Sequence, residues 1–258
     1  MAAIPVPTTP SSPILDELKL ANERLESFAY VASHDLRAPL RAIMALSEWI
    51  GENLKEEYGE VPASVSADLT EIFAQGRRMD KLLTDLLDYS RIGNAHETRS
   101  PFNAEEVVLD CINLCRIPPD FSVRLEPGFP DFQCSKVELS IAVRNLLCNA
   151  IRHHDKASGK IVIFAGEKDG QGFLTVEDDG PGVPIEHREV IFEMFRTMSP
   201  KGGSGLGLGM VRKIAERSSG SVDVTGNPEG RGSRFSVRLP IREPGFARSG
   251  GDADDASP

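Results

Sequence analysis

The sequence predicts an α+β protein in which an antiparallel helical hairpin precedes a mixed α/β domain. A long heptad pattern in the first part of the chain predicts the hairpin, and short apolar segments joined by glycines predict the mixed domain. The composition agrees with a folded protein, because 40% of the 258 residues are hydrophobic and 26% are charged.

Apolar residues recur at alternating steps of three and four residues over two segments, which predicts two long helices with a packing seam. The clearest positions of this stripe are Leu15, Leu36, Ile43, Leu46 and Ile50 in the first helix and Leu69, Ile72, Met79, Leu83 and Leu86 in the second. Residues 58–62 predict the turn between the helices. A hairpin of this kind lacks a partner on one side, so we expect a homodimer that closes a four-helix bundle.

The pattern changes after residues 92–94, where helices and strands begin to alternate. We expect helices over 107–114, 137–151 and 206–217, and strands over 160–165, 173–176, 222–225 and 234–239. These elements predict an α/β sandwich. The expected domains are therefore a disordered tail over 1–13, the hairpin over 14–95, the mixed domain over 96–242 and a disordered acidic tail over 243–258.

Charge and hydropathy exclude several classes of partner. The formal net charge is -10, which argues against broad binding to nucleic acid or to anionic lipid. No apolar run reaches the length of a membrane span, and the first residues lack the basic start and apolar core of a signal peptide. We therefore expect a cytoplasmic protein with no nucleic-acid partner and no membrane partner.

His34 falls at a heptad position that points away from the bundle core, where a solvated histidine is the ordinary outcome. Its neighbour Asp35 can hold one ring nitrogen as N–H, which leaves the lone pair of the other nitrogen free as a nucleophile. Pro39 removes a helix hydrogen bond five residues later and predicts a bend there. The segment 33–40, Ser-His-Asp-Leu-Arg-Ala-Pro-Leu, resembles the histidine phosphorylation box of two-component sensor kinases (HisKA-type).

Three blocks in the mixed domain suit a nucleotide. Asn145 and Asn149 share one helix face, and their amide oxygens can join a Mg²⁺ shell, although such residues also cap helices or face solvent. In the Asp-Asp-Gly-Pro-Gly segment 178–182, a carboxylate at a strand end can accept from an amino group such as that of adenine, or can form an ordinary turn. The glycine run 202–209 opens a helix whose N–H groups suit phosphate oxygens, and it fits neither a Walker loop nor a Rossmann fingerprint.

With the segment 191–195, these blocks resemble the N, G1, F and G2 boxes of the histidine-kinase ATP-binding domain (HATPase_c). That domain has the Bergerat fold of the gyrase–Hsp90–histidine kinase–MutL superfamily, and soluble phytochrome-type kinases are the nearest group. The resemblance implies that Asp178 binds adenine, that Gly180 and Gly182 shape its pocket, and that Asn149 and Asn145 hold Mg²⁺. It further implies a phosphate contact for Arg152, a nucleoside contact for His153, a mobile lid containing Lys201, and a triphosphate cradle formed by Gly203, Gly205, Leu206 and Gly207.

The implied activity is autophosphorylation of His34 from Mg-ATP, with Asp35 as the orienting base, followed by transfer of the phosphoryl group to an aspartate of a response-regulator receiver domain. A histidine phosphotransfer scaffold without autokinase activity is the alternative, and an ATPase clamp gives no reason for the His34 box. Ala38 stands where regulator-dephosphorylating relatives carry Thr or Asn, so we expect weak phosphatase activity. Few residues precede the first helix, so we expect no sensor domain in this chain and a separate sensor or photoreceptor as a possible partner.

Overall fold

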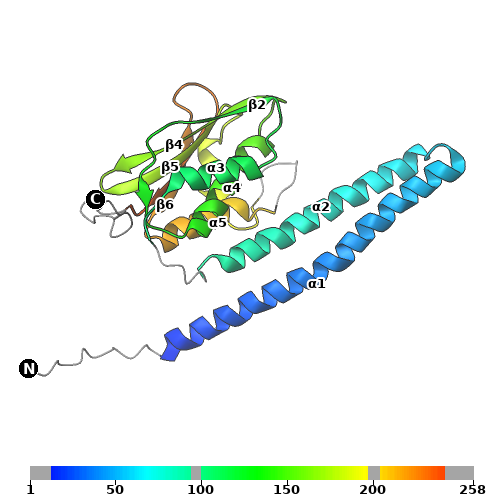
Figure 1. Ribbon diagram of the computed structural model, residues 1–258, viewed down its shortest axis with the longest axis horizontal. Coiled ribbons are helices and arrows are strands. Elements are labelled where there is room, and N and C mark those ends of the chain that lie inside the picture. Colours follow the sequence, from blue (N-terminus) through cyan, green and yellow to red (C-terminus); the bar gives the residue numbers. More distant parts are fainter. Residues whose placement is uncertain (1–12, 94–99, 197–203, 242–258) are drawn as a thin grey trace, which may run out of the picture. The chain divides into compact units, whose positions relative to one another are not determined.

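The computed structural model describes residues 13–93, 100–196 and 204–241, with side chains described from Val31 onward. The chain forms two compact units, one containing a helical hairpin and the other a mixed α/β domain (Figure 1). The predicted α+β class is therefore confirmed. The domain limits expected at residues 13/14, 95/96 and 242/243 fall at or within segments outside the described residues, and they stay predictions.

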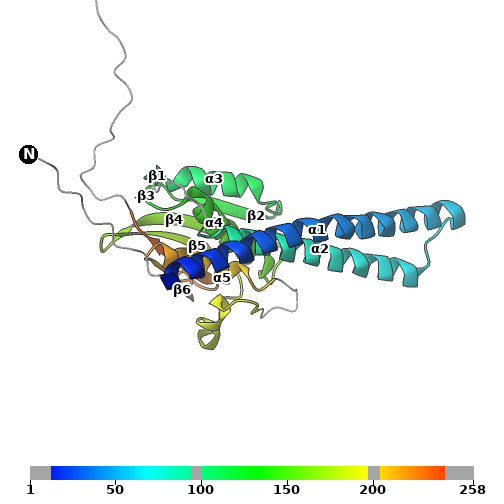
Figure 2. The ribbon, with the colours of Figure 1, turned by 90° about the horizontal axis from the view of Figure 1, so that it is seen from below.

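The hairpin consists of α1 (Pro13–Tyr58) and α2 (Ala63–Arg91), which lie side by side (Figure 2). The predicted turn joins them, and Gly59 supplies its left-handed backbone, with φ at 78°. Pro39 lies inside α1, and the helix continues through it. The bend predicted at Pro39 stays a prediction.

α1 packs against α2 through one face, on which buried residues recur every seven positions. Ser33, Leu40 and Ser47 are buried there, each one heptad after the last. On α2, Gly76 leaves room for the side chain of Met44, because a Cβ at Gly76 would lie 2.7 Å from Cγ of Met44. Small residues therefore allow the helices to approach closely.

The predicted apolar stripe lies on a neighbouring face of α1. Its members Leu36, Ile43, Leu46 and Ile50 are each at least half exposed in the single chain. The heptad pattern predicted an apolar face correctly, but in the single hairpin that face is not the one that packs against α2. A second apolar face therefore remains open.

The second unit contains a five-stranded sheet in the order β2-β4-β5-β7-β6 (Figure 1). Its strands are β2 (Phe121–Leu125), β4 (Gly159–Lys168), β5 (Gln171–Asp178), β6 (Ser221–Gly226) and β7 (Ser233–Leu239). β2 runs parallel to β4, and the other neighbours are antiparallel. The expected strands all occur here, whereas β2 and the short ladder of β1 (Phe102–Asn103) with β3 (Asp131–Phe132) were not expected.

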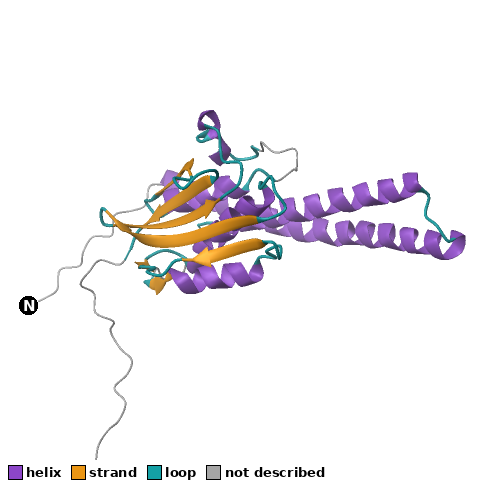
Figure 3. Cartoon of the chain, turned by 90° about the horizontal axis from the view of Figure 1, so that it is seen from above, coloured by secondary structure: helices purple, strands orange, loops and turns teal. Residues whose placement is uncertain are grey.

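Three helices accompany the sheet as a second layer (Figure 3). They are α3 (Ala104–Leu114), α4 (Lys136–Arg152) and α5 (Gly207–Arg217). Helices α4 and α5 contact the sheet and each other, and α3 contacts α4. The apolar residues of α4 and α5 fill the space between the layers, and the largest fully buried side chains among them are Leu139, Leu146, Leu147, Met210 and Ile214. Two short 3-10 helices, Ile185–His187 and Val190–Phe192, follow the loop after β5.

This packing brings the chain segments that carry the motifs to defined places. The Ser135 side chain accepts the Glu138 N–H at 3.2 Å and fixes the start of α4, so both asparagines follow on one helix face. β5 is central in the sheet and ends at Asp178. Helix α5 begins at Gly207, so the last residues of the glycine run 202–209 form its first turn.

Candidate functional site

His34 is exposed on the surface of α1, with 77% of its side chain accessible to solvent. Its Nδ1 lies 3.2 Å from Oδ1 of Asp35. When Nδ1 carries the proton and donates to Asp35, Nε2 keeps an available lone pair. Since both side chains are exposed, this pair orients the ring and adds little to stability.

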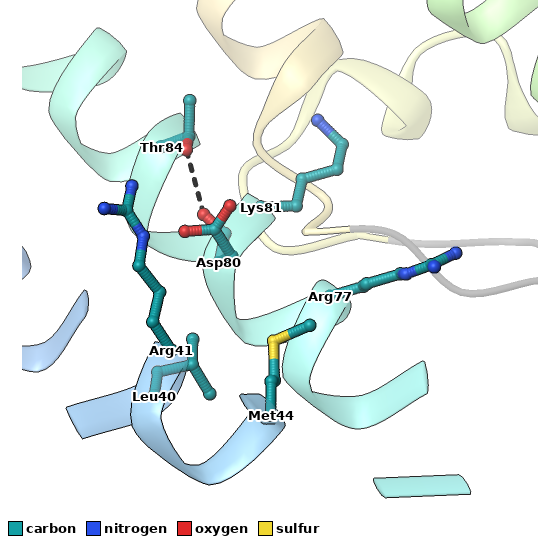
Figure 4. Close-up of a pocket in the computed structure, with 7 residues that line it drawn as sticks. All are labelled: Leu40, Arg41, Met44, Arg77, Asp80, Lys81 and Thr84. Atoms are coloured by element: carbon teal, nitrogen blue, oxygen red, sulfur yellow. Dashed lines mark hydrogen bonds between the residues drawn. The ribbon is translucent and has the colours of Figure 1, made fainter. Parts of the chain in front are cut away.

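Arg37 connects the two helices of the hairpin one turn after His34. Its Nε donates to Oδ1 of Asp80 at 3.1 Å, and a terminal nitrogen donates to Oγ1 of Thr84 at 3.2 Å. The Thr84 hydroxyl donates in turn to the Asp80 carbonyl oxygen at 2.9 Å (Figure 4). The segment that contains His34 is therefore held in register with α2.

An open hollow of about 480 Å³ lies between the helices near this connection (Figure 4). Leu40 and Met44 contribute apolar atoms to it, Arg41, Arg77 and Lys81 contribute cationic groups, and the Asp80 carboxylate also lines it. Arg41 follows His34 by two helical turns, so both project from the same side of α1. The hairpin thus combines an exposed histidine with a cationic hollow.

Asp178 is a nearly buried carboxylate at the end of β5. Its Oδ1 accepts the N–H of Gly180 at 2.9 Å and the N–H of Ser233 at 3.2 Å. Burial raises the pKa of Asp178 above its ordinary value, although these two hydrogen bonds act in the opposite direction. The second carboxylate oxygen has no hydrogen bond described and can receive a ligand's donor.

Glycines allow the chain to close tightly around this carboxylate. Gly182 and Gly232 have φ values of 81° and 120°, a region that favours glycine. A Cβ at Gly232 would lie 1.8 Å from the Asp178 carbonyl oxygen, and a Cβ at Gly182 would lie 3.0 Å from the Gly232 carbonyl oxygen. The loop 178–182, which includes Gly180, therefore packs closely against the turn before β7.

Asn145, Asn149 and Arg152 follow one another at steps of four and three residues on α4, and all three are half-buried. Nδ2 of Asn145 donates to the Ile141 carbonyl oxygen at 2.8 Å, which leaves Oδ1 as the acceptor end of the amide. A Cβ at Gly207 would lie 2.7 Å from that Oδ1. The start of α5 thus lies against Asn145, and oxygen ligands and helix N–H groups come together.

The remaining predicted residues are only partly described. Lys201 and Gly203 lie outside the described residues. Gly205 has a φ of 69°, and the Ser204 hydroxyl accepts the N–H of Leu206 at 3.2 Å just before α5. His153 is the exposed C-cap of α4, and its N–H donates to the Asn149 carbonyl oxygen at 3.0 Å.

The sequence interpretation missed His154, which is buried and whose Nε2 lies 3.1 Å from Oδ1 of Asp179. It also missed Arg231, whose guanidinium is 2.7 Å from a carboxylate oxygen of Asp155. The available signal for His154 was its place just after a helix end and next to an acidic residue.

In the described part of the chain, no helix is both long enough and apolar enough to cross a bilayer. The same residues contain no cluster of three or more His, Cys, Asp or Glu side chains able to hold a metal ion. A cation at the α4 face would therefore depend on amide oxygens together with groups of a bound ligand and water.

Two family models match the chain. The His Kinase A (phospho-acceptor) domain matches residues 24–95, and the Histidine kinase-, DNA gyrase B-, and HSP90-like ATPase matches residues 134–243. Cyanobacterial phytochrome B of Nostoc sp. is 32% identical over 232 residues, covering 86% of this chain and 30% of that protein. Phytochrome-like protein Cph1 of Synechocystis sp. is 29% identical, covering 87% of this chain and 30% of that protein.

The solved structure of full-length ShkA in complex with AMPPNP shares the fold. Its TM-score is 0.59 at 24% identity, and the alignment covers 83% of this chain and 46% of that chain. The chain spans about 30% of the length of the two phytochromes that it matches.

A hairpin that exposes a histidine and a separate ATPase-type α/β unit define the phosphotransfer proteins of two-component signalling. This chain belongs to the sensor histidine kinases, with a phospho-acceptor domain and an ATP-binding domain. By family, the phospho-acceptor domain implies dimerisation and a response-regulator partner.

Proposed function

We propose that the protein transfers the γ-phosphoryl group of ATP to His34 and then passes it to an aspartate of a response-regulator receiver domain. One observation carries the proposal: the same chain contains an exposed histidine paired with a carboxylate and a buried carboxylate closed by glycine loops. The first suits a phosphoryl acceptor, and the second suits recognition of adenine.

ATP would bind between α4, the loop 178–182 and the start of α5. Asp178 accepts a hydrogen bond from the adenine amino group, and Gly180 and Gly182 leave room for the base. Arg152 and His153, at the end of α4, contact the phosphates and the nucleoside. Backbone N–H groups of Gly205, Leu206 and Gly207, just before and at the start of α5, bind phosphate oxygens, and the Leu206 N–H exchanges the Ser204 hydroxyl for a phosphate oxygen.

The residues present fit a magnesium ion bound together with ATP. Asn149 and Asn145 offer neutral amide oxygens one helical turn apart, which is a ligand type that Mg²⁺ accepts. When bound, the ion supplies charge neutralisation at the transferring phosphate. Arg152 adds positive charge on the same helix face.

In the transfer itself, Nε2 of His34 forms a bond to the γ-phosphorus while the bond to the β-phosphate oxygen breaks and ADP leaves. The proton stays on Nδ1, where Asp35 accepts it in a hydrogen bond and offsets the positive charge of the ring. In the second transfer, the receiver aspartate attacks the phosphorus and the imidazole leaves. The hollow lined by Arg41, Arg77, Lys81 and Asp80, on the His34 side of α1, has an excess of positive charge and suits an acidic face of the receiver domain.

The open apolar stripe of α1 supports the homodimer, and Ala38 supports weak phosphatase activity because its methyl group cannot position a water molecule. The two phytochromes among the relatives support a photoreceptor as the source of the input signal. A pull-down from lysate that recovers a photoreceptor would support this input, and recovery of the response regulator alone would contradict it.

The test is incubation with γ-labelled ATP and Mg²⁺ of the parent and the His34→Gln and Asn149→Ala variants. His187→Gln serves as a control that removes a histidine elsewhere in the ATP-binding domain. We expect acid-labile, alkali-stable label on the parent and the control, and on neither of the other two. No label on a parent that binds ATP would instead favour the phosphotransfer scaffold.

A further inference from the structure

The buried histidine His154 contacts the loop that carries Asp178, and the phosphotransfer steps above give it no role. Its side chain is 1% exposed and lies just after the C-cap of α4. The ring of Phe121 from β2 meets it edge-on, with the centroids 5.2 Å apart. A histidine enclosed in this way has its ring position fixed by packing and by hydrogen bonds.

The contacts of the two ring nitrogens fix the tautomer of a neutral ring. The N–H of Lys156 donates to Nδ1 at 3.1 Å, so Nδ1 is an acceptor and the proton is on Nε2. Nε2–H then donates to Oδ1 of Asp179 at 3.1 Å. The Lys156 carbonyl oxygen lies 3.3 Å from Nδ1, but only the Nε2–H form satisfies both the Lys156 N–H and Asp179.

Asp179 is thereby anchored at the base of the loop. Its Oδ1 also accepts the N–H of Lys160 at 2.7 Å, so one oxygen holds the start of β4 and the histidine together. Burial alone would raise the pKa of Asp179, but the hydrogen bonds from Lys160 and His154 outweigh it and keep the pKa below its ordinary value. The carboxylate therefore stays ionised and remains a strong acceptor.

The ring also limits the position of the next residue, Gly180. A Cβ at Gly180 would lie 3.3 Å from Cδ2 of His154 and 2.9 Å from Oδ1 of Asp178. Gly180 is thus held between the histidine ring and the carboxylate proposed to recognise adenine. Movement of the ring would move the backbone N–H that orients Asp178.

We propose that His154 is a positioning residue of the nucleotide site: its Nε2–H holds Asp179 and so preorganises Asp178 for the adenine base. The inference rests on the proposed function, because it takes Asp178 to be the adenine acceptor. A loop already fixed in its binding conformation loses less entropy when the nucleotide binds, so the contact acts on affinity.

The test compares Mg-ADP binding by calorimetry in the parent, His154→Leu, His154→Gln and Phe121→Leu. We expect His154→Leu to weaken binding by about tenfold, the size of one charge-assisted hydrogen bond. His154→Gln keeps an N–H that can reach Asp179, so its affinity stays within about threefold of the parent. Phe121→Leu loosens the packing but keeps the hydrogen bond, so it lowers the melting temperature and weakens binding much less than His154→Leu does.

A spectroscopic measurement tests the contact without nucleotide. In ¹⁵N-labelled parent, the ring of His154, assigned by its loss in His154→Gln, should show a protonated Nε2 and an unprotonated Nδ1. A proton on Nδ1 of the neutral ring, or equal affinities of the parent and His154→Leu, would overturn the inference alone. A parent that binds no Mg-ADP would overturn the proposed function together with it.

Discussion

At the scale of single residues, Asp178 has the clearest electrostatic signature of the candidate site. Its carboxylate must be ionised to accept the adenine amino group, and burial raises its pKa. Nucleotide affinity is therefore full above this raised pKa and falls as the pH drops through it. We expect the fall to begin at a higher pH than the ordinary aspartate value of about 3.9 would give.

Calorimetric titration with Mg-ADP, from neutral pH down to the lowest pH at which circular dichroism shows a folded protein, measures this dependence. Asp178→Asn removes the titrating group, so its weaker binding should not show the same decline. Parallel pH profiles for the parent and Asp178→Asn would contradict the assignment of Asp178 as the adenine acceptor.

Ala38 gives a second prediction at this scale. It is exposed on α1 one turn after His34, and its methyl group has no hydrogen-bonding atom. Ala38→Thr places a hydroxyl where it can position a water molecule for attack on the phosphorylated regulator, so dephosphorylation should accelerate by about tenfold or more. The assay follows loss of label from purified phospho-regulator, with Ala42→Thr as the control one turn further along the same exposed helix. Equal rates of regulator dephosphorylation for the two variants and the parent would contradict the role assigned to position 38.

The sequence predicted the positions of individual side chains within regular helices, but not beyond the ends of those helices. The pair Asn145 and Asn149 lies on one face because α4 is regular through both positions. After Arg152 the helix stops, and His153 takes a non-helical C-cap conformation with φ at -90°. The helical period therefore says nothing about which of two adjacent histidines is buried, and the tertiary structure buries His154.

At the scale of elements, the turn between β6 and β7 supports the loop after β5. Substitutions at two glycines of that turn can distinguish the effect of a steric clash from the effect of backbone strain. Gly230 and Gly232 both have positive φ, but a Cβ at Gly230 meets nothing within 4 Å. Gly232→Ala should destabilise the domain by about 3 kcal/mol or more, because it adds a clash with the Asp178 carbonyl to the strain. Gly230→Ala should cost about 1 kcal/mol from strain alone.

Urea unfolding of the two variants measures the difference, and ADP binding should fail only in Gly232→Ala. Similar losses of stability in both would mean that the turn does not support the Asp178 loop.

The elements found from sequence were those with a long or clean pattern. The three helices of the mixed domain and the strands β4, β5, β6 and β7 have such patterns. β2 was missed because it is short, contains no fully buried residue and lies at the sheet edge between proline-containing segments. Its parallel pairing with β4 is a long-range contact that local propensity does not encode.

At the scale of the whole molecule, α1 has two adjacent faces with different uses. One packs against α2 through Ser33, Leu40 and Ser47, and the other leaves a row of large apolar residues exposed. Exposing so much contiguous apolar surface is unfavourable for an isolated hairpin, which is why a second copy is expected to cover it. The heptad pattern could predict this stripe but could not say whether α2 or a second copy covers it, because both contacts share one period.

Charge placed on the stripe should therefore separate the dimer. Ile43→Glu and Leu46→Glu put carboxylates on side chains that are each 54% exposed in the single chain. Within a dimer these carboxylates would be buried without partners, which costs several kcal/mol for the pair of subunits, so we expect monomers at micromolar concentration. Ala45→Glu adds the same charge on an exposed position of α1 outside the stripe and should leave the dimer intact.

Light scattering after size-exclusion chromatography measures the mass of the parent and of each variant. Dimers that persist in both stripe variants would show that this face is not the interface, and a monomeric Ala45→Glu would show that net charge, rather than the stripe, controls assembly.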